Sequence, residues 1–362
     1  MKFKTGHRVI MLLITLVATA ILMWLLQCLL VPKYQKGIVE GGMMAEYYDD
    51  LDVPHEVLFL GDCEVYEDIS TVELYREYGI SSYIRGSAQQ LVWQSYYILE
   101  DTLQYETPEV VVFNVYALAY NEPQSDSYNH MTLDGLRWSG VKWDAVQASM
   151  TEDEKMTDYL FPLLYYHTRW SDLKQTDYEH MFTKDPVTIN GYYLRADVRP
   201  QGEFPEPKML TDPNLGKNAM LWLNKIAILC EENGIDLVLV KAPTEYPHWY
   251  DEWDQQVSDF AASRDIPYTN YITIRDDIGI DMSTDTYDGG LHLNVYGAEK
   301  YADALGQFLV ENYSLTDYRT VPDIASLWDN KAAAYDALIQ SQLDEIEQYG
   351  ELQSWGIGAV ED

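Results

Sequence analysis

The stretch VLFLGDCEVY, residues 57–66, is typical of a short apolar strand that passes through a tight turn into a helix. Gly61, Asp62 and Cys63 form the turn. In an open parallel sheet, reactive groups gather at the carboxyl ends of the strands. The pattern therefore places the Cys63 side chain at such an end and at a helix N-terminus, where the helix dipole lowers the pKa of a thiol. Cys63 is a candidate nucleophile, and a buried inert cysteine is the alternative interpretation.

The rest of the chain alternates short apolar runs with helical stretches, which is typical of an α/β sheet with crossover helices. The run VVVFNV, residues 110–115, shows no polar alternation, as expected for a central parallel strand covered on both faces. We predict a flavodoxin-like three-layer α/β sandwich with a central parallel sheet. Its expected strands are 57–60, 81–84, 110–115, 237–242 and 267–271, and its expected helices are 71–78, 89–105, 217–233, 252–263 and 295–312.

The N-terminus carries an uncharged apolar run from Val9 to Val31, long enough to span the hydrocarbon core of a bilayer. Three basic residues in the first eight positions favour a cytoplasmic N-terminus and an exported main domain at the cell membrane. A cleaved signal peptide is the alternative. The predicted order is a cytoplasmic head (1–8), a transmembrane helix (9–31), a stalk (32–54), a domain (55–315) with an insertion at about 120–215, and a helical tail (316–362).

Composition narrows the function without naming it. The 362 residues include 59 acidic and 24 basic ones, giving a net charge of −35, which argues against nucleic-acid binding. Three cysteines are too few for a disulfide framework. A single Cys63–Cys230 disulfide is disfavoured, because the two residues are expected at opposite edges of the sheet. No CxxC or HxxxH spacing occurs, so we expect no metal and no cofactor.

The segment YDGGLHLNVYG, residues 287–297, places Asp288 four residues before His292, just ahead of an amphipathic helix. A carboxylate in this arrangement fixes the tautomer of an imidazole whose other nitrogen then serves as a base. A surface pair is the alternative interpretation, and Asp285 is a spare candidate for the acid. The chain thus presents a nucleophile, an acid and a histidine in that order.

These residues resemble the SGNH (GDSL-like) hydrolases and acyltransferases over roughly residues 55–312. The GDC sequence at 61–63 stands where that family has Gly-Asp-Ser. SYIRGSAQQ is similar to the second block of the family and makes Gly86 an oxyanion donor by resemblance. The third block, Gly-x-Asn-Asp, is not reproduced, and Asn114 and Asn121 are both candidates for its amide. The last block resembles Asp288 and His292 with one extra residue between them.

The membrane-anchored layout and the KAP segment at 241–243 are similar to one branch of this family, the D-alanine transfer and alginate acetylation proteins. The resemblance implies an acyltransferase or esterase for O-acyl groups of a cell-envelope polysaccharide. His292, oriented by Asp288, would deprotonate Cys63 for attack on an acyl carbonyl. The oxyanion would rest on the backbone N–H groups of Cys63 and Gly86 and on an Asn amide. A polytopic membrane acyltransferase is the implied partner that supplies the acyl group.

Two further interpretations stay open. Since cysteine replaces the family's serine, the domain could instead be an inactive glycan-binding or scaffold protein. In the insertion, Arg137 and Trp138 are candidates for lining an acceptor groove together with His130 and Asp134, and packing of an aromatic lid is the alternative. The tail at about 323–352 has helical periodicity and is expected to pack back on the domain, to bind a partner, or to be exposed.

Overall fold

The computed structural model describes residues 2–32, 42–183 and 186–353. Its centre is a five-stranded sheet in the order β2-β1-β3-β4-β5, with all neighbours parallel. This is the flavodoxin-like order, and it confirms the predicted fold class. The strands are β1 (Val57–Gly61), β2 (Ser82–Gly86), β3 (Val110–Asn114), β4 (Asp236–Lys241) and β5 (Tyr268–Asn270).

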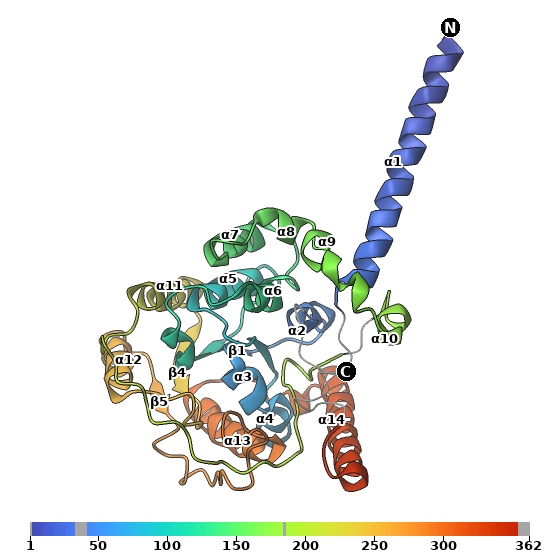
Figure 1. Ribbon diagram of the computed structural model, residues 1–362. Coiled ribbons are helices and arrows are strands. Elements are labelled where there is room, and N and C mark those ends of the chain that lie inside the picture. The colour runs from blue at the N-terminus through green and yellow to red at the C-terminus, as the bar shows by residue number, and fades with distance from the viewer. Residues whose placement is uncertain (1, 33–41, 184–185, 354–362) are drawn as a thin grey trace.

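Helices cover both faces of the sheet (Figure 1). One layer contains α5 (Val92–Thr102), α7 (Gly140–Ser149) and α11 (Lys217–Asn233); the other contains α3 (Cys63–Asp68), α4 (Thr71–Tyr78) and α13 (Val295–Asn312). Successive β1 residues alternate between the two cores: Val57 and Phe59 face one, and Leu58 and Leu60 face the other. Apolar side chains on both faces of each strand are therefore what builds the three layers. Helix α12 (Asp251–Ser263) lies beside β5 at the sheet edge.

The N-terminal helix α1 (Lys2–Leu30) extends away from the domain. Its segment Gly6–Leu30 is 25 residues long and apolar enough to cross a membrane; most of it is exposed, and its last residues contact the domain, where Leu30 is buried. Such a helix is consistent with a single-pass anchor or with a signal sequence.

The structure differs from the predicted stalk over the part of it that is described after α1. Helix α2 (Gly42–Glu46) and the 3-10 helix η1 (Tyr47–Asp49) pack against the domain. Met44 and Tyr47 are buried in its core, and the Glu46 carboxylate accepts hydrogen bonds from the backbone N–H groups of Val187 and Thr188. The apolar and aromatic side chains of this segment gain more from burial than from exposure on a stalk.

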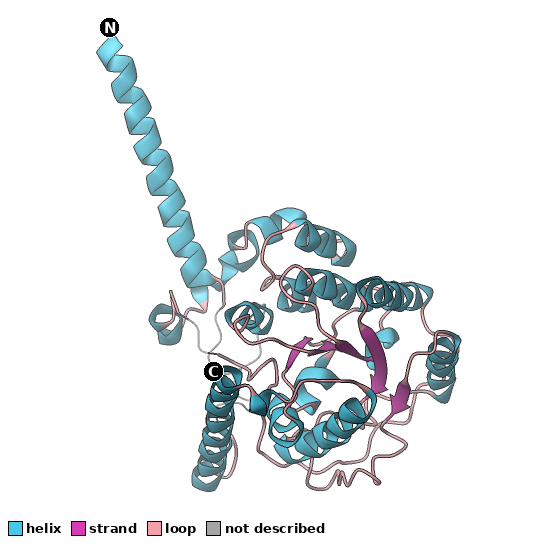
Figure 2. Cartoon of the chain, turned by 180° about the vertical axis from the view of Figure 1, so that it is seen from behind, coloured by secondary structure: helices cyan, strands magenta, loops and turns pink. Residues whose placement is uncertain are grey.

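The expected insertion follows β3 and forms a set of short helices on one side of the domain (Figure 2). The 3-10 helix η2 (Val115–Ala119) directly follows β3, and the insertion then contains α6 (Asp126–Leu133), α7, α8 (Met156–Leu160), α9 (Leu163–Tyr166), η3 (His167–Ser171) and α10 (Gln175–Glu179).

The C-terminal tail packs back on the domain. After η4 (Tyr318–Thr320), helix α14 (Pro322–Tyr349) buries Trp328, which stacks on Tyr75 with ring centroids 5.0 Å apart. The indole Nε1 donates to Ser81 Oγ at 3.0 Å, and the Gln342 Oε1 accepts from the Ala196 N–H at 2.7 Å. The tail is therefore an integral part of the fold.

Candidate active site

The turn after β1 brings Cys63 to the carboxyl edge of the sheet. Gly61 has φ +152°, and a Cβ on it would lie 2.9 Å from Asn114 Cβ, so a glycine is required here. Asp62 is the N-cap of α3, and its side chain accepts from the Glu64 N–H at 3.4 Å. Cys63 is the first residue of α3, as the sequence predicts.

A buried polar network supports this turn from below. Lys241 Nζ, at the end of β4, lies 2.8 Å from Glu64 Oε1, and both side chains are buried. The Asn114 Nδ2, at the end of β3, donates to Glu64 Oε2 at 2.8 Å and to Asp62 Oδ1 at 3.1 Å. The network ties together the ends of three strands at the residue that precedes Cys63 and the one that follows it.

The two asparagines proposed as oxyanion donors are engaged elsewhere. The amide group of Asn114 donates to the carboxylates of Asp62 and Glu64. Asn121 Oδ1 accepts from the backbone N–H groups of Asn218, at 2.9 Å, and Ala219, at 3.3 Å, in the first turn of α11. Both side chains therefore stabilise the fold through these hydrogen bonds.

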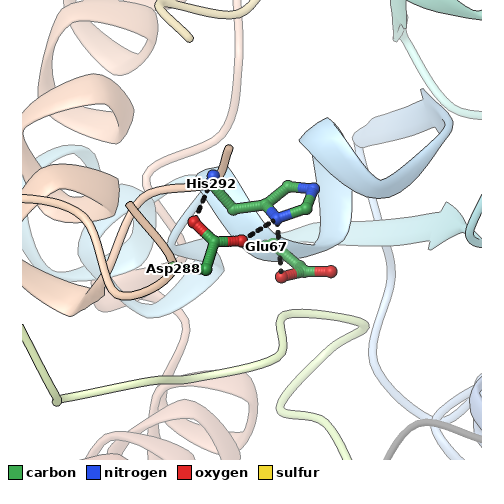
Figure 3. Close-up of side chains that lie close together, drawn as sticks. All are labelled: Glu67, Asp288 and His292. Carbon is green, nitrogen blue, oxygen red and sulfur yellow. Dashed lines mark hydrogen bonds and ion pairs between the residues drawn. The ribbon is translucent and has the colours of Figure 1, made fainter. Parts of the chain in front are cut away.

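His292 lies between two carboxylates (Figure 3). Its Nδ1 is 2.7 Å from Asp288 Oδ2 and 3.4 Å from Glu67 Oε2, and its backbone N–H donates to Asp288 Oδ1 at 2.9 Å. The second ring nitrogen points away from both carboxylates in Figure 3. The predicted Asp288–His292 pair is thus formed, and Glu67 joins it.

Glu67 belongs to the helix that carries the candidate nucleophile. It follows Cys63 by four residues, about one turn of α3, so both side chains lie on the same helix face. The next residue, Asp68, accepts a hydrogen bond from the Leu293 N–H at 2.7 Å. Helix α3 therefore holds the histidine loop through two buried acids. In the sequence, the acidic residues that follow Cys63 were the feature that could have indicated this role of Glu67.

The Cys63 thiol and the His292 imidazole lie close enough for each to shift the pKa of the other. Since Nδ1 faces the two carboxylates, Nε2 is the atom left to approach the thiol. The structure thus brings together three predicted residues, Cys63, His292 and Asp288, that lie more than 220 positions apart at the extremes.

The pKa of the Cys63 thiol is shifted in the direction opposite to the one that the helix dipole predicts. Burial raises the pKa of the Cys63 thiol to about 12; the Asp62 carboxylate adds to this rise and His292 opposes it. Burial and a nearby acid outweigh the dipole of a helix of only six residues. Burial by itself lowers the pKa of His292, but Glu67, Cys63 and Asp288 outweigh it and hold that pKa well above its usual value. Burial thus favours the neutral form of the thiol, and the neighbouring acids favour the charged form of the imidazole.

The remaining wall of the site contains a glycine and two tyrosines. Gly86 pairs with Gly61 across the sheet, and a Cβ on it would lie 2.3 Å from Val65 Cγ2 and 3.1 Å from Gly61 O. The backbone of Gly86 thus lies against the nucleophile turn. Burial raises the pKa of Tyr116 and of Tyr120, and in both cases the Cys63 and Asp62 charges add to the rise. The sequence argument did not select them.

Glu67, Asp288 and His292 could also hold a metal ion. One ligand atom from each lies within 4.8 Å of the other two. A cation bound there would take His292 Nδ1 away from Asp288, so it would compete with the arrangement that orients the imidazole. The sequence motifs had given no sign of this group.

Other predicted residues have packing partners. Asp285 pairs with Lys300 at 2.5 Å, and Arg137 lies 4.4 Å above the Tyr48 ring. Trp138 is half-exposed, with Lys142 Nζ at 4.7 Å from its ring.

Two residues that invited a functional interpretation are structural here. His130 is buried, bonded to Asp134 at 2.9 Å, and stacked between Tyr159 and Tyr165. Cys230 is buried in α11 and forms no disulfide with Cys63.

Comparison with known proteins found similar solved structures, among them an acylhydrolase and a lipase. No protein-family profile and no curated protein matches the chain. A candidate acylhydrolase from Bacteroides fragilis NCTC 9343 is 11% identical, with 74% of this chain and 94% of that chain covered, at a TM-score of 0.36. A GDSL-like lipase from Bacteroides thetaiotaomicron VPI-5482 is 12% identical, with 75% and 98% covered, at a TM-score of 0.34. At scores this low the likeness assigns no family.

Proposed function

We propose that this chain is a membrane-anchored, exported SGNH-like enzyme that acts on O-acyl groups of a cell-envelope glycan through Cys63, His292 and Asp288. One observation carries the proposal. A cysteine at a strand-to-helix turn lies near a histidine whose Nδ1 is held by the Asp288 carboxylate at 2.7 Å, which leaves the other ring nitrogen to act as the base. This is the arrangement that nucleophilic acyl transfer requires.

In the proposed mechanism, His292 in its neutral form accepts the proton of Cys63 as Sγ attacks the acyl carbonyl. Because the pKa of the thiol is about 12, the proton leaves during the attack rather than beforehand. Backbone N–H groups of Cys63 and Gly86 would face the oxyanion, each typically worth about 3 kcal/mol. The imidazolium then protonates the departing alkoxide, leaving a thioester on Cys63.

A hydroxyl group or water resolves the thioester. Its oxygen attacks the acyl carbon, His292 takes the proton, and Sγ leaves as the thiolate and is reprotonated. With a glycan hydroxyl the chain is an acyltransferase, and with water it is an esterase. For a transferase, a polytopic membrane acyltransferase is the proposed source of acyl groups. Basic residues in the first turns of α1, ahead of its apolar span, and an acidic domain support a cytoplasmic N-terminus and an exported site.

The alternative function is an inactive SGNH-like domain that binds glycan or scaffolds a complex. The observation that favours it is the raised pKa of Cys63, which leaves little thiolate at neutral pH. The retained pairing of His292 with Asp288 favours the enzyme.

Acylation of the full-length chain in detergent tests the proposal. We expect p-nitrophenyl acetate to add one acetyl group, mapped to Cys63 by mass spectrometry. Cys63→Ala and His292→Ala should abolish the adduct, whereas Cys63→Ser should keep ester turnover, because a serine hydroxyl can use the same base. A folded wild-type chain with neither adduct nor turnover would refute the enzyme and favour the binding protein.

A further inference from the structure

Five apolar side chains that are each more than half exposed lie in the insertion, on or beside α8, α9, η3 and α10. We call them the insertion patch: Phe161, Leu164, Trp170, Tyr178 and Phe182. They are between 52% and 71% exposed. Large side chains gathered at one part of a surface commonly mark an interaction site.

The insertion patch is continuous with α1. Phe182 stacks on Trp24 with ring centroids 5.8 Å apart and an interplanar angle of 29°. Arg169 Nη1 donates to the backbone carbonyl of Leu30 at 2.6 Å. In Figures 1 and 2, α9 and α10 flank the end of α1 that meets the domain.

The contact between Phe182 and Trp24 shows where the insertion patch lies along the axis of α1. Trp24 precedes Leu30 by six residues, which corresponds to about 9 Å along the helix. Phe182 therefore lies beside the apolar span of α1 and not beyond its end. Side chains of interfacial helices are buried about 5–10 Å into the headgroup and acyl boundary, which is the same range.

The charges around the insertion patch also fit a lipid surface. Residues 159–171 contain no Asp or Glu and include Arg169, although the chain as a whole has 59 acids in 362 residues. Anionic head groups repel carboxylates, and aromatic side chains are enriched at the membrane–water interface. The α9–η3 part of the insertion next to α1 is thus apolar, aromatic and free of acids, whereas α10, which also lies next to α1, carries Glu179 and Asp177, the latter paired with Arg169 at 3.0 Å.

We propose that the insertion patch lies in the headgroup region of the bilayer leaflet from which α1 emerges. The domain would then rest on the membrane in one orientation, where the sequence alone suggested a domain held away from it. The inference depends on the anchoring part of the proposed function, in that α1 must remain on the mature chain. It does not depend on the acyl chemistry.

Photo-crosslinking to lipid tests this surface. The full-length chain is reconstituted in phosphatidylcholine/phosphatidylglycerol vesicles that contain a phospholipid with a diazirine near its head group. After irradiation, the labelled peptides are mapped by mass spectrometry. We expect labelling in residues 159–182 in addition to α1. Exposed apolar residues far from α1, such as Leu221 on α11 and Val310 on α13, serve as internal controls and should stay unlabelled.

Matched variants complete the test. The triple variant Phe161→Ser, Leu164→Ser and Trp170→Ser should lose the insertion label and keep the α1 label, while Leu221→Ser with Val310→Ser should change neither. Labelling confined to α1 would overturn the proposal, as would a crosslink of the insertion to a protein. An intact mass that lacks α1 would overturn it as well. None of these outcomes bears on the acylation of Cys63, which is measured separately.

Discussion

Replacing Lys241 by methionine should destabilise the domain strongly, because it leaves the buried Glu64 carboxylate without its cation. The Lys241 Nζ makes an ion pair with Glu64 at 2.8 Å and donates to the carbonyls of Ala242 and Thr244, each at 2.9 Å. Breaking a buried ion pair from one side costs about 3–5 kcal/mol. Glu64 keeps hydrogen bonds from Asn114 and Thr244, so we expect about 3–4 kcal/mol for Lys241→Met.

The double variant Lys241→Met with Glu64→Gln isolates the charge. It removes the stranded carboxylate, and its cost should fall to about 1–2 kcal/mol, mainly for the two unpaired carbonyl groups. Lys300→Met is the matched control, because the Lys300 side chain is 40% exposed and its pair with Asp285 should contribute about 1 kcal/mol or less.

These differences in the free energy of unfolding are measured by urea unfolding of the full-length chain in detergent, followed by tryptophan fluorescence. A change in stability shows as a shifted urea midpoint with an unchanged m-value. A typical domain has about 5–15 kcal/mol of stability, so each variant should still fold. The reasoning is refuted if Lys241→Met costs no more than Lys300→Met, or if the double variant is as unstable as Lys241→Met alone.

Three further predictions concern pH and packing. The acylation rate should rise with pH above the usual titration range of histidine, since the pKa of His292 is raised, and Glu67→Gln should move this rise to lower pH. A pH–rate profile that Glu67→Gln leaves in place would show that Glu67 does not act on His292. Burial raises the pKa of Asp62 from 3.8 to about 7, so the unfolded chain releases this proton first and stability falls as pH rises between these values. Asp62→Asn should therefore gain stability relative to wild type over that window, and a gain independent of pH in urea melts would contradict this. Trp328→Ala should cost about 3–5 kcal/mol, while its exposed neighbour Leu327→Ala should cost little, and equal unfolding midpoints for the two would disprove the docking of α14.

The secondary structure was predictable because it follows from local patterns. The predicted helices 71–78 and 217–233 coincide with α4 and α11, and every predicted strand overlaps an observed one. Uninterrupted apolar runs required a sheet covered on both faces, and the strand-end rule placed Cys63 at the carboxyl edge. Asp288 and His292 are four residues apart in one loop, so their pairing was visible as well.

The environment of the candidate nucleophile was not predictable in the same way. The position of Cys63 at a helix terminus predicted a lowered thiol pKa, whereas the fold partly buries the thiol beside Asp62 and raises that pKa. Asn114 was selected as an oxyanion donor from its position after a strand, but it turned out to bond two carboxylates that lie within two residues of Cys63.

The sequence by itself determined the strands, the main helices, the apolar α1 and the order of Cys63, Asp288 and His292, because these depend on spacing along the chain. Only the tertiary structure decided that Glu67 contacts His292, that α14 packs against Tyr75, and that the insertion meets the end of α1. These contacts join residues far apart in sequence. Which of these residues come into contact depends on which apolar surfaces are buried against each other. The same removal of water shifts the pKa values of the groups in the site.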